Sequence, residues 1–386
     1  MKQAVLLLTS LALAACTKTP PANSARISAG GSSITDPDDN TAPQQLEPMT
    51  IVGYTTDELL ARFGRARNRM LAGEHLGAAS EFDDVSRLAS DPELVATSLY
   101  NAGLGYAKAK QPELALRRYQ DLDRRFGEQS MAGEARLRAM RILSYLERWP
   151  ELAGAAKRVL NRPDLNRLER IEAYGHRALA EVSTGDLAGA RVSITKAQTA
   201  IEKAGLGRSG PPPVELATVS FAEGELRRIE SEQIRLFPVP ANFGEALEQR
   251  CQGLLDAQSS YTEAMRSNDP HWAAKSGFRV GQLYQRLHEE AMKIPPPATA
   301  DDRQRALFTS AMRLRYRILL KKGLRMMEGT VRLSARTGED SVWIDRAKQA
   351  KAELERSLAE EKAVLARSPY TEEEIQAALD KLRGDG

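Results

Sequence analysis

The residues best suited to hold a metal ion or move a proton are four histidines: His75, His176, His271 and His288. None of them has a second histidine four positions away, the spacing that places two imidazoles on one helix face around zinc. The two cysteines are too few for a disulfide framework or a multi-cysteine metal site. Adjacent carboxylates such as Asp83 and Asp84 are expected to be solvated, and nothing raises the pKa of either for general acid work. We therefore predict no catalytic residue, no metal site and no enzymatic activity.

A glycine-rich segment, residues 205–210 (GLGRSG), matches the glycine spacing of dinucleotide-binding loops. That chemistry requires a strand before the glycines and a helix directly after them. Here a helical pattern precedes the glycines, and three prolines follow them at 211–213. We interpret the segment as a linker and predict no cofactor.

Basic residues gather in the segment 313–336, where Glu328 is the one acidic residue. One interpretation is a basic surface that meets anionic lipid, lipopolysaccharide or an acidic partner. The other is a helix whose arginines pair with acids on neighbouring helices. The residues of the candidate basic surface are Arg313, Arg317, Lys321, Lys322 and Arg325. The whole chain has 55 basic and 52 acidic residues and a formal charge of +3, which argues against a nucleic-acid partner.

The N-terminus predicts an exported protein. Lys2 precedes an apolar run at residues 4–15, which is too short to span a bilayer and is typical of a cleaved signal peptide, residues 1–15. The run ends in Leu13-Ala14-Ala15-Cys16, which resembles the bacterial lipobox, and this resemblance implies a covalent lipid on Cys16. Thr17, where an Asp would retain the protein in the inner membrane, implies the outer membrane. The alternative is an ordinary secretory signal that happens to contain a cysteine.

The elements that must position any site are helices. Residues 16–54 are rich in Pro, Ser, Thr and Asp without apolar periodicity, so we expect a disordered tether. From residue 55 apolar residues recur at three- and four-residue spacing, and no stretch alternates as a strand would. We predict an all-α fold: a repeat array over 55–204, and a C-terminal array of longer helices over 214–384 that continues the solenoid.

Internal repeats indicate the architecture. A small residue is followed by an aromatic or aliphatic residue four positions later, as at Ala78–Phe82 and Ala115–Tyr119. Successive copies begin at alanines 78, 115, 153 and 190, a period of 37 or 38 residues. Such a period predicts stacked helical hairpins, because one hairpin alone cannot bury its apolar face. The alternative is a helical array without repeats.

These residues resemble the tetratricopeptide repeat (TPR) family over about residues 58–200. The best copy, residues 96–126, matches it at Gly103, Tyr106, Ala115 and Tyr119. The resemblance implies a concave groove lined by first helices that binds a partner segment. Carried onto this chain, the groove residues are Tyr100, Asn101, Leu104 and Lys108, continued by Arg138 and Arg141. Packing between adjacent helices is the alternative role for Tyr100.

The C-terminal part, with Trp272, Gly281, Tyr284 and a proline turn at 295–297, resembles TPR lipoproteins of gliding delta-proteobacteria. That resemblance implies a lipid-anchored scaffold on the periplasmic face of the outer membrane that binds other envelope proteins. Envelope machines for motility or transport are the implied setting. The alternative function is an envelope-binding module that recognises peptidoglycan or anionic lipid through the basic helix 313–336.

Overall fold

The computed structural model describes residues 53–207 and 210–384, and every regular element within them is a helix. The signal peptide, Cys16 and nearly all of the expected tether lie outside the described residues. The fourteen described helices are α2 (Thr56–Leu71), α3 (His75–Leu88), α4 (Pro92–Lys108), α5 (Pro112–Phe126), α6 (Ser130–Tyr145), α7 (Trp149–Leu160), α8 (Arg167–Thr184), α9 (Leu187–Ala204), α10 (Glu215–Glu232), α11 (Phe243–Met265), α12 (Pro270–Ala291), α13 (Asp302–Thr337), α14 (Val342–Ala366) and α15 (Glu372–Gly384). The all-α prediction and the longer C-terminal helices are confirmed.

The helices begin where side chains can satisfy their free backbone N–H groups. At the start of α2, the Thr55 hydroxyl accepts from the Glu58 backbone and the Glu58 carboxylate accepts from the Thr55 backbone. The same reciprocal cap opens α8 and α13. Gly205, with a φ of +65°, ends α9 in the left-handed conformation that glycine adopts without strain. A helix rather than a strand therefore precedes the glycine-rich segment, as the linker interpretation requires.

The first helices stack as hairpins in chain order. α3 packs between α2 and α4, α5 between α4 and α6, and α7 between α6 and α8. Within the best-matching copy, Gly103 of α4 receives the ring of Tyr119 from α5: a Cβ at residue 103 would lie 2.6 Å from Cε1 of that ring. Gly224 of α10 receives Tyr261 of α11 in the same way, with a hypothetical Cβ 2.7 Å from Cδ1. These contacts confirm a TPR-like helical-hairpin solenoid.

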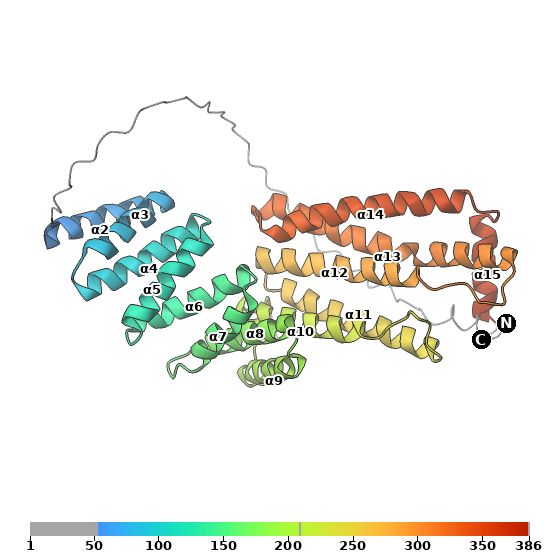
Figure 1. The fold of residues 1–386 in the computed structure, drawn as a ribbon, viewed down its shortest axis with the longest axis horizontal. Coiled ribbons are helices and arrows are strands. Elements are labelled where there is room, and N and C mark those ends of the chain that lie inside the picture. The colour runs from blue at the N-terminus through green and yellow to red at the C-terminus, as the bar shows by residue number, and fades with distance from the viewer. Residues whose placement is uncertain (1–52, 208–209, 385–386) are drawn as a thin grey trace, which may run out of the picture.

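Two arms face each other across the molecule (Figure 1). The N-terminal arm is α2–α7, the C-terminal arm is α12–α15, and α8–α11 join them at the bottom of the view. α8 packs against both α9 and α10, so the stacking of helices continues past the linker while α9 lies to one side.

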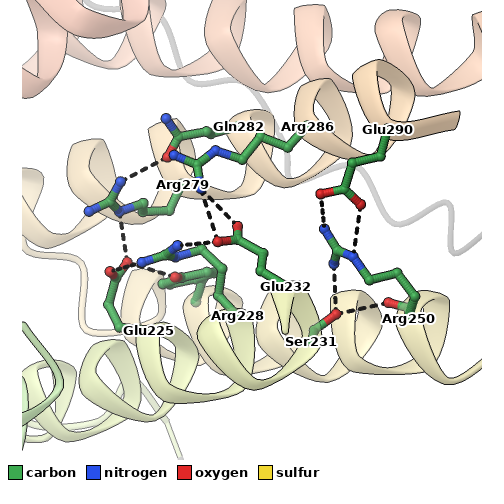
Figure 2. A network of polar contacts seen from close by, with 10 residues as sticks. Glu225, Arg228, Ser231, Glu232, Arg250, Arg279, Gln282, Arg286 and Glu290 are labelled. Atoms are coloured by element: carbon green, nitrogen blue, oxygen red, sulfur yellow. Dashed lines mark hydrogen bonds and ion pairs between the residues drawn. The ribbon is translucent and has the colours of Figure 1, made fainter. Parts of the chain in front are cut away.

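Buried ion pairs join α10, α11 and α12 in the joining region (Figure 2). Glu225 of α10 is 4% exposed and lies 2.7 Å from Nε of Arg279 and 2.9 Å from Nη2 of Arg228. The Tyr261 hydroxyl donates to the same carboxylate at 2.7 Å. Burial alone would raise the pKa of Glu225, but Arg279 and Arg228 lower it to about 2. The carboxylate therefore stays ionised inside the helix stack.

A second ion pair in this region involves Arg250 of α11, which is 1% exposed. Its guanidinium contacts Glu290 of α12 at 3.1 Å and donates to the Ser231 hydroxyl of α10 at 2.7 Å (Figure 2). Buried charges need partners of this kind because an unpaired one is costly to desolvate. The network ties α12, the first helix of the C-terminal arm, to α10 and α11 of the joining region.

No helix among residues 53–207 and 210–384 is both long enough and apolar enough to cross a bilayer.

Candidate functional site

The main candidate site is a cleft of about 620 Å³ between the two arms. Its wall comes from the C-terminal ends of α4 and α6, from the N-terminal ends of α10 and α12, from α8 and from the α13–α14 loop. The lining residues are Ala107, Lys110, Pro112, Arg141, Ile142, Ser144, Tyr145, Glu172, His176, Val214, Glu215, Asp269, His271, Trp272 and Asp340. The first helices of successive hairpins thus supply most of this surface, with Lys110 and Pro112 added from the α4–α5 turn and the start of α5.

One wall of the cleft carries a fixed guanidinium. Arg141 of α6 donates to both carboxylate oxygens of Glu172 on α8, each at 2.7 Å. Burial alone would raise the pKa of Glu172, but hydrogen bonds from His176 and Arg141 lower it to about 2. The Glu172 side chain is 8% exposed and that of Arg141 43%, so the arginine presents its free edge to the cleft.

His176 adds an unused polar atom to this wall. The residue is 3% exposed, and its Nε2 lies 3.5 Å from Oε1 of Glu172. Its Nδ1 has no hydrogen-bond partner among the described residues. A buried ring nitrogen without a partner is uncommon in a folded protein, and it marks this wall as polar beneath its surface.

A second part of the cleft lining is aromatic. The ring centroid of His271 lies 5.3 Å from that of Tyr145 and 5.8 Å from that of Trp272. Nδ1 of His271 is 3.3 Å from Oε1 of Glu339, and this hydrogen bond lowers the pKa of Glu339. The Tyr145 side chain is nearly half exposed. This wall therefore combines apolar ring surface with polar edges, as partner-binding surfaces do.

Ion pairs join the two arms at the mouth of the cleft. Lys110, in the α4–α5 turn, pairs with Asp340, and Glu147, in the α6–α7 turn, pairs with Arg346 of α14 at 3.1 Å. Lys110 and Asp340 are both about two thirds exposed or more, so their pair contributes little to stability.

Behind the aromatic wall, Lys275 of α12 occupies a cage of four rings and is 2% exposed. Its Nζ lies 4.7 Å from the ring centroid of Phe221, 5.1 Å from Trp343, 5.3 Å from Trp272 and 5.4 Å from Trp149. The rings come from α7, α10, α12 and α14, and Trp272 also lines the cleft. Burial lowers the pKa of Lys275 to about 8, although Glu147 and Glu225 oppose that shift. The cage connects both arms to the base of the cleft.

Acidic side chains outnumber basic side chains in the cleft lining. Four carboxylates (Glu172, Glu215, Asp269 and Asp340) line it against two cationic side chains, Lys110 and Arg141. Glu172 and Asp340 are each paired within the wall. Glu215 has no ion pair among the described residues. The cleft therefore favours a cationic or neutral ligand over an anionic one.

The predicted groove residues separate into different environments. Arg141 lines the cleft. Nε of Arg138 donates to the Tyr100 hydroxyl at 2.9 Å, and the Tyr100 ring packs edge-on against Tyr119 with 6.0 Å between centroids. Tyr100 and Arg138 thus hold α4, α5 and α6 together.

The other groove candidates, all on α4, lie outside the cleft lining. Nδ2 of Asn101 donates to the Thr97 carbonyl oxygen at 2.8 Å within the helix. Leu104 is half-buried and Lys108 is exposed.

The candidate basic surface also divides. Arg313 pairs with Glu361 of α14 at 2.9 Å, and Arg317 pairs with Glu372 of α15 at 2.9 Å. Lys322 lies over the Tyr284 ring at 5.3 Å. Lys321 and Arg325 are exposed. The alternative interpretation, that these side chains pair with acids on neighbouring helices, therefore holds for Arg313 and Arg317.

One carboxylate departs from the expectation. Asp83 was expected to be solvated, but it is 9% exposed, accepts from the Tyr106 hydroxyl at 2.8 Å and pairs with Arg118 at 2.8 Å. Burial raises the pKa of Asp83, against the opposing effect of these two partners. The cause is the hairpin stack itself, which turns this face of α3 toward α4 and α5.

The sequence did not indicate His176, His271 or Glu172 as site residues. His176 lies on α8 of the joining region and His271 on α12 of the C-terminal arm, and both line one cleft because the chain turns back on itself. No group of three or more metal-ligating residue types in the described part of the chain is placed to hold a metal ion.

Comparison with known proteins gives likeness to solved structures only. No family model matches the chain. No curated protein matches it either. A TPR protein from Parabacteroides merdae aligns with 77% of this chain and 99% of its own, at 9% identity and a TM-score of 0.40. A TPR repeats protein from Bacteroides fragilis aligns with 68% of this chain and 98% of its own, at 14% identity and a TM-score of 0.28.

The TPR2AB domain of yeast Sti1, in its pHSP90 complex, aligns with 69% of this chain and 98% of its own, at 13% identity and a TM-score of 0.29. The assignment of this chain rests on its own packing: hairpins stacked in chain order and glycines that receive tyrosines from the next helix. The described residues form a TPR-like helical-hairpin solenoid.

Proposed function

We propose that this protein is a non-enzymatic scaffold that holds a segment of another protein in the cleft between its arms. The observation that carries the proposal is the cleft itself, about 620 Å³ in volume and lined by both arms. Stacked hairpins present a preformed surface, so little conformational entropy is lost when a partner docks. The paired side chains of the wall, such as Arg141 with Glu172, are already ordered for contact.

The chemistry of the cleft favours a basic segment with an apolar or aromatic anchor. Rings of Tyr145, His271 and Trp272 offer faces on which a guanidinium or an aromatic side chain can stack. Glu215, which has no ion pair among the described residues, supplies a carboxylate for a cationic side chain. Charge complementarity of this kind selects partners and speeds their association.

We further propose that the scaffold is anchored in the outer membrane by a lipid on Cys16 and faces the periplasm. The support is the apolar run at residues 4–15 that ends in Leu-Ala-Ala-Cys. Several acyl chains on one residue give stable anchoring. Its partners would be other envelope proteins, in a machine for motility or transport. Labelled palmitate should enter the wild-type protein and be absent from Cys16→Ala; label that persists in that variant contradicts the anchor.

Cross-linking in membranes of the producing cells, followed by affinity capture and quantitative mass spectrometry, tests the cleft. Tyr145→Ala and Glu215→Lys should each deplete the same set of captured proteins by about tenfold or more, because both residues line the cleft. Lys108→Ala is the control, since Lys108 is exposed on α4 but does not line the cleft. An unchanged set of captured proteins in both cleft variants would rule out the cleft as the binding site.

A further inference from the structure

A second surface, on α13, is separate from the cleft. α13 supplies no residue to the cleft wall and packs against α12, α14 and α15 within the C-terminal arm. Four basic residues, Lys321, Arg325, Arg332 and Arg336, follow one another at intervals of four, seven and four residues. These intervals place them on one face of the helix, in a row about 22 Å long at 1.5 Å per residue. We call this row the α13 basic row.

The α13 basic row is exposed, and its side chains form few ion pairs within the described part of the protein. All four residues are exposed. Arg332 has one distant partner, Glu328 on the same helix, at 3.8 Å. Lys321, Arg325 and Arg336 have no ion pair among the described residues. Arg313 and Arg317 at the other end of α13 are paired with α14 and α15, so the free positive charge is concentrated in the second half of the helix.

An apolar groove lies beside the row. It has a volume of about 460 Å³ and runs between the α11–α12 turn and α13. Met265, Ala273, Met326 and Leu333 give it an apolar lining, and Arg325 and Arg336 of the basic row line it as well. Ile318, 46% exposed, lies about one turn before Lys321 and adds apolar surface beside the basic row.

We propose that this face of α13 docks on an anionic lipid surface, with the basic row on the headgroups and the groove receiving apolar chains. A straight row of exposed cations on one helix face matches many negative groups lying in one plane, which an anionic bilayer presents. Lys and Arg side chains near such a surface each favour binding, and adjacent apolar surface adds to the affinity. The proposal does not rest on the function of the cleft, because no residue of the row lines the cleft and the groove shares with it only Asp269, at the start of α12.

Co-flotation of the full chain with vesicles tests this proposal, with Cys16→Ser in every sample so that no lipid is attached. The chain should bind mixed phosphatidylglycerol–phosphatidylcholine vesicles and not pure phosphatidylcholine vesicles. Reversal of the row (Lys321→Glu, Arg325→Glu, Arg332→Glu, Arg336→Glu) should weaken binding by about tenfold or more. Raising the salt from about 0.15 M to about 1 M should weaken it similarly, because the charges are exposed.

A charge-matched control separates the row from net charge. Arg65, Arg67, Arg117 and Arg158 are exposed on α2, α5 and α7, and their reversal to Glu changes the net charge of the chain equally. This control should retain vesicle binding within about twofold. If circular dichroism shows that the Glu variant has lost helicity, a variant with Gln at the four row positions replaces it. This Gln variant should also weaken vesicle binding.

The proposal is overturned if the row variant and the control lose vesicle binding to the same extent. It is also overturned if the chain binds both kinds of vesicle equally. If the chain ignores the vesicles but binds a poly-glutamate peptide through the same row, the occupant is an acidic polypeptide and the membrane proposal is wrong.

Discussion

Tyr119 lies so close to Gly103 that a single added methyl group at residue 103 would come within 2.6 Å of its ring. Tyr119 is 1% exposed and cannot withdraw into solvent. Gly103→Ala should therefore destabilise the protein, since overpacking of about 1–3 kcal/mol outweighs a helix-propensity gain of about 1 kcal/mol. Urea unfolding followed by circular dichroism measures the change.

Gly64→Ala is the matched control. Gly64 also lies inside a helix, α2, but a Cβ there meets nothing within 4 Å. This variant should be as stable as the wild type or more stable by up to about 1 kcal/mol. If both alanine variants gain stability, the glycine–tyrosine contact does not limit the hairpin geometry.

This contact also shows what sequence analysis can predict. Gly103, Ala115 and Tyr119 lie within two consecutive helices, so their spacing alone fixes which faces meet. The buried position of Ala115 and of Ala78, at 0% exposure each, follows from the same local pattern. The packing of these apolar residues was therefore predictable from the sequence, whereas the burial of the charged Asp83 was not.

The cleft was not predictable in the same way. Its wall extends from Ala107 to Asp340, and it depends on how far the stack of hairpins curves before the arms meet. Small rotations at each hairpin accumulate to give that curvature, and no local motif encodes it. Tyr100 and Arg138, which the family resemblance assigns to a groove, contact each other between helices, the packing role given as the alternative for Tyr100.

The second prediction concerns Lys275 and pH. Its pKa is lowered to about 8 in the folded protein, against roughly 10.4 in an unfolded chain. The unfolded state therefore binds more protons between these values, so stability should rise as the pH increases from about 8 to about 10. Below about pH 8 the lysine is protonated in both states, and this contribution stays constant. The rise is at most about 3 kcal/mol, because the surrounding rings favour the ammonium form.

Tryptophan fluorescence measures this titration directly. The three tryptophans of the chain all lie within 5.4 Å of Nζ, measured to their ring centroids. We expect a fluorescence change with a midpoint near pH 8 that is lost in Lys275→Met, a variant of similar shape without the amine. A midpoint that is the same in both proteins would assign the change to another group.

The third prediction concerns acid stability. Glu225 has a pKa lowered to about 2, against roughly 4.3 when unfolded. Its stabilising contribution is therefore complete above about pH 4 and is lost as the pH falls toward 2. Glu225→Gln should cost about 3–5 kcal/mol at neutral pH, because it leaves Arg228 and Arg279 buried without their carboxylate.

Glu223→Gln is the comparison for this prediction, because Glu223 pairs with Arg227 on the more exposed side of the same helix. It should cost under about 1 kcal/mol. Below about pH 4 the free energy of unfolding of Glu225→Gln should fall less steeply with decreasing pH than that of the wild type, because residue 225 no longer takes up a proton. Acid unfolding curves measure this slope. A shift of the variant's curve to higher pH at equal starting stability would mean that other carboxylates dominate.

The last prediction separates stability from binding in the cleft. Glu172→Gln removes the charge that holds Arg141 in place, and we expect a loss of about 1.5–3 kcal/mol. The cost stays moderate because the Arg141 side chain is 43% exposed and can be rehydrated. Glu215→Gln, which alters a cleft carboxylate with no ion pair among the described residues, should change the free energy of unfolding by less than about 0.5 kcal/mol. Partner capture should fall in both variants. Capture that falls only in Glu172→Gln would mean that the fixed guanidinium, and not the negative charge of the cleft, recognises the partner.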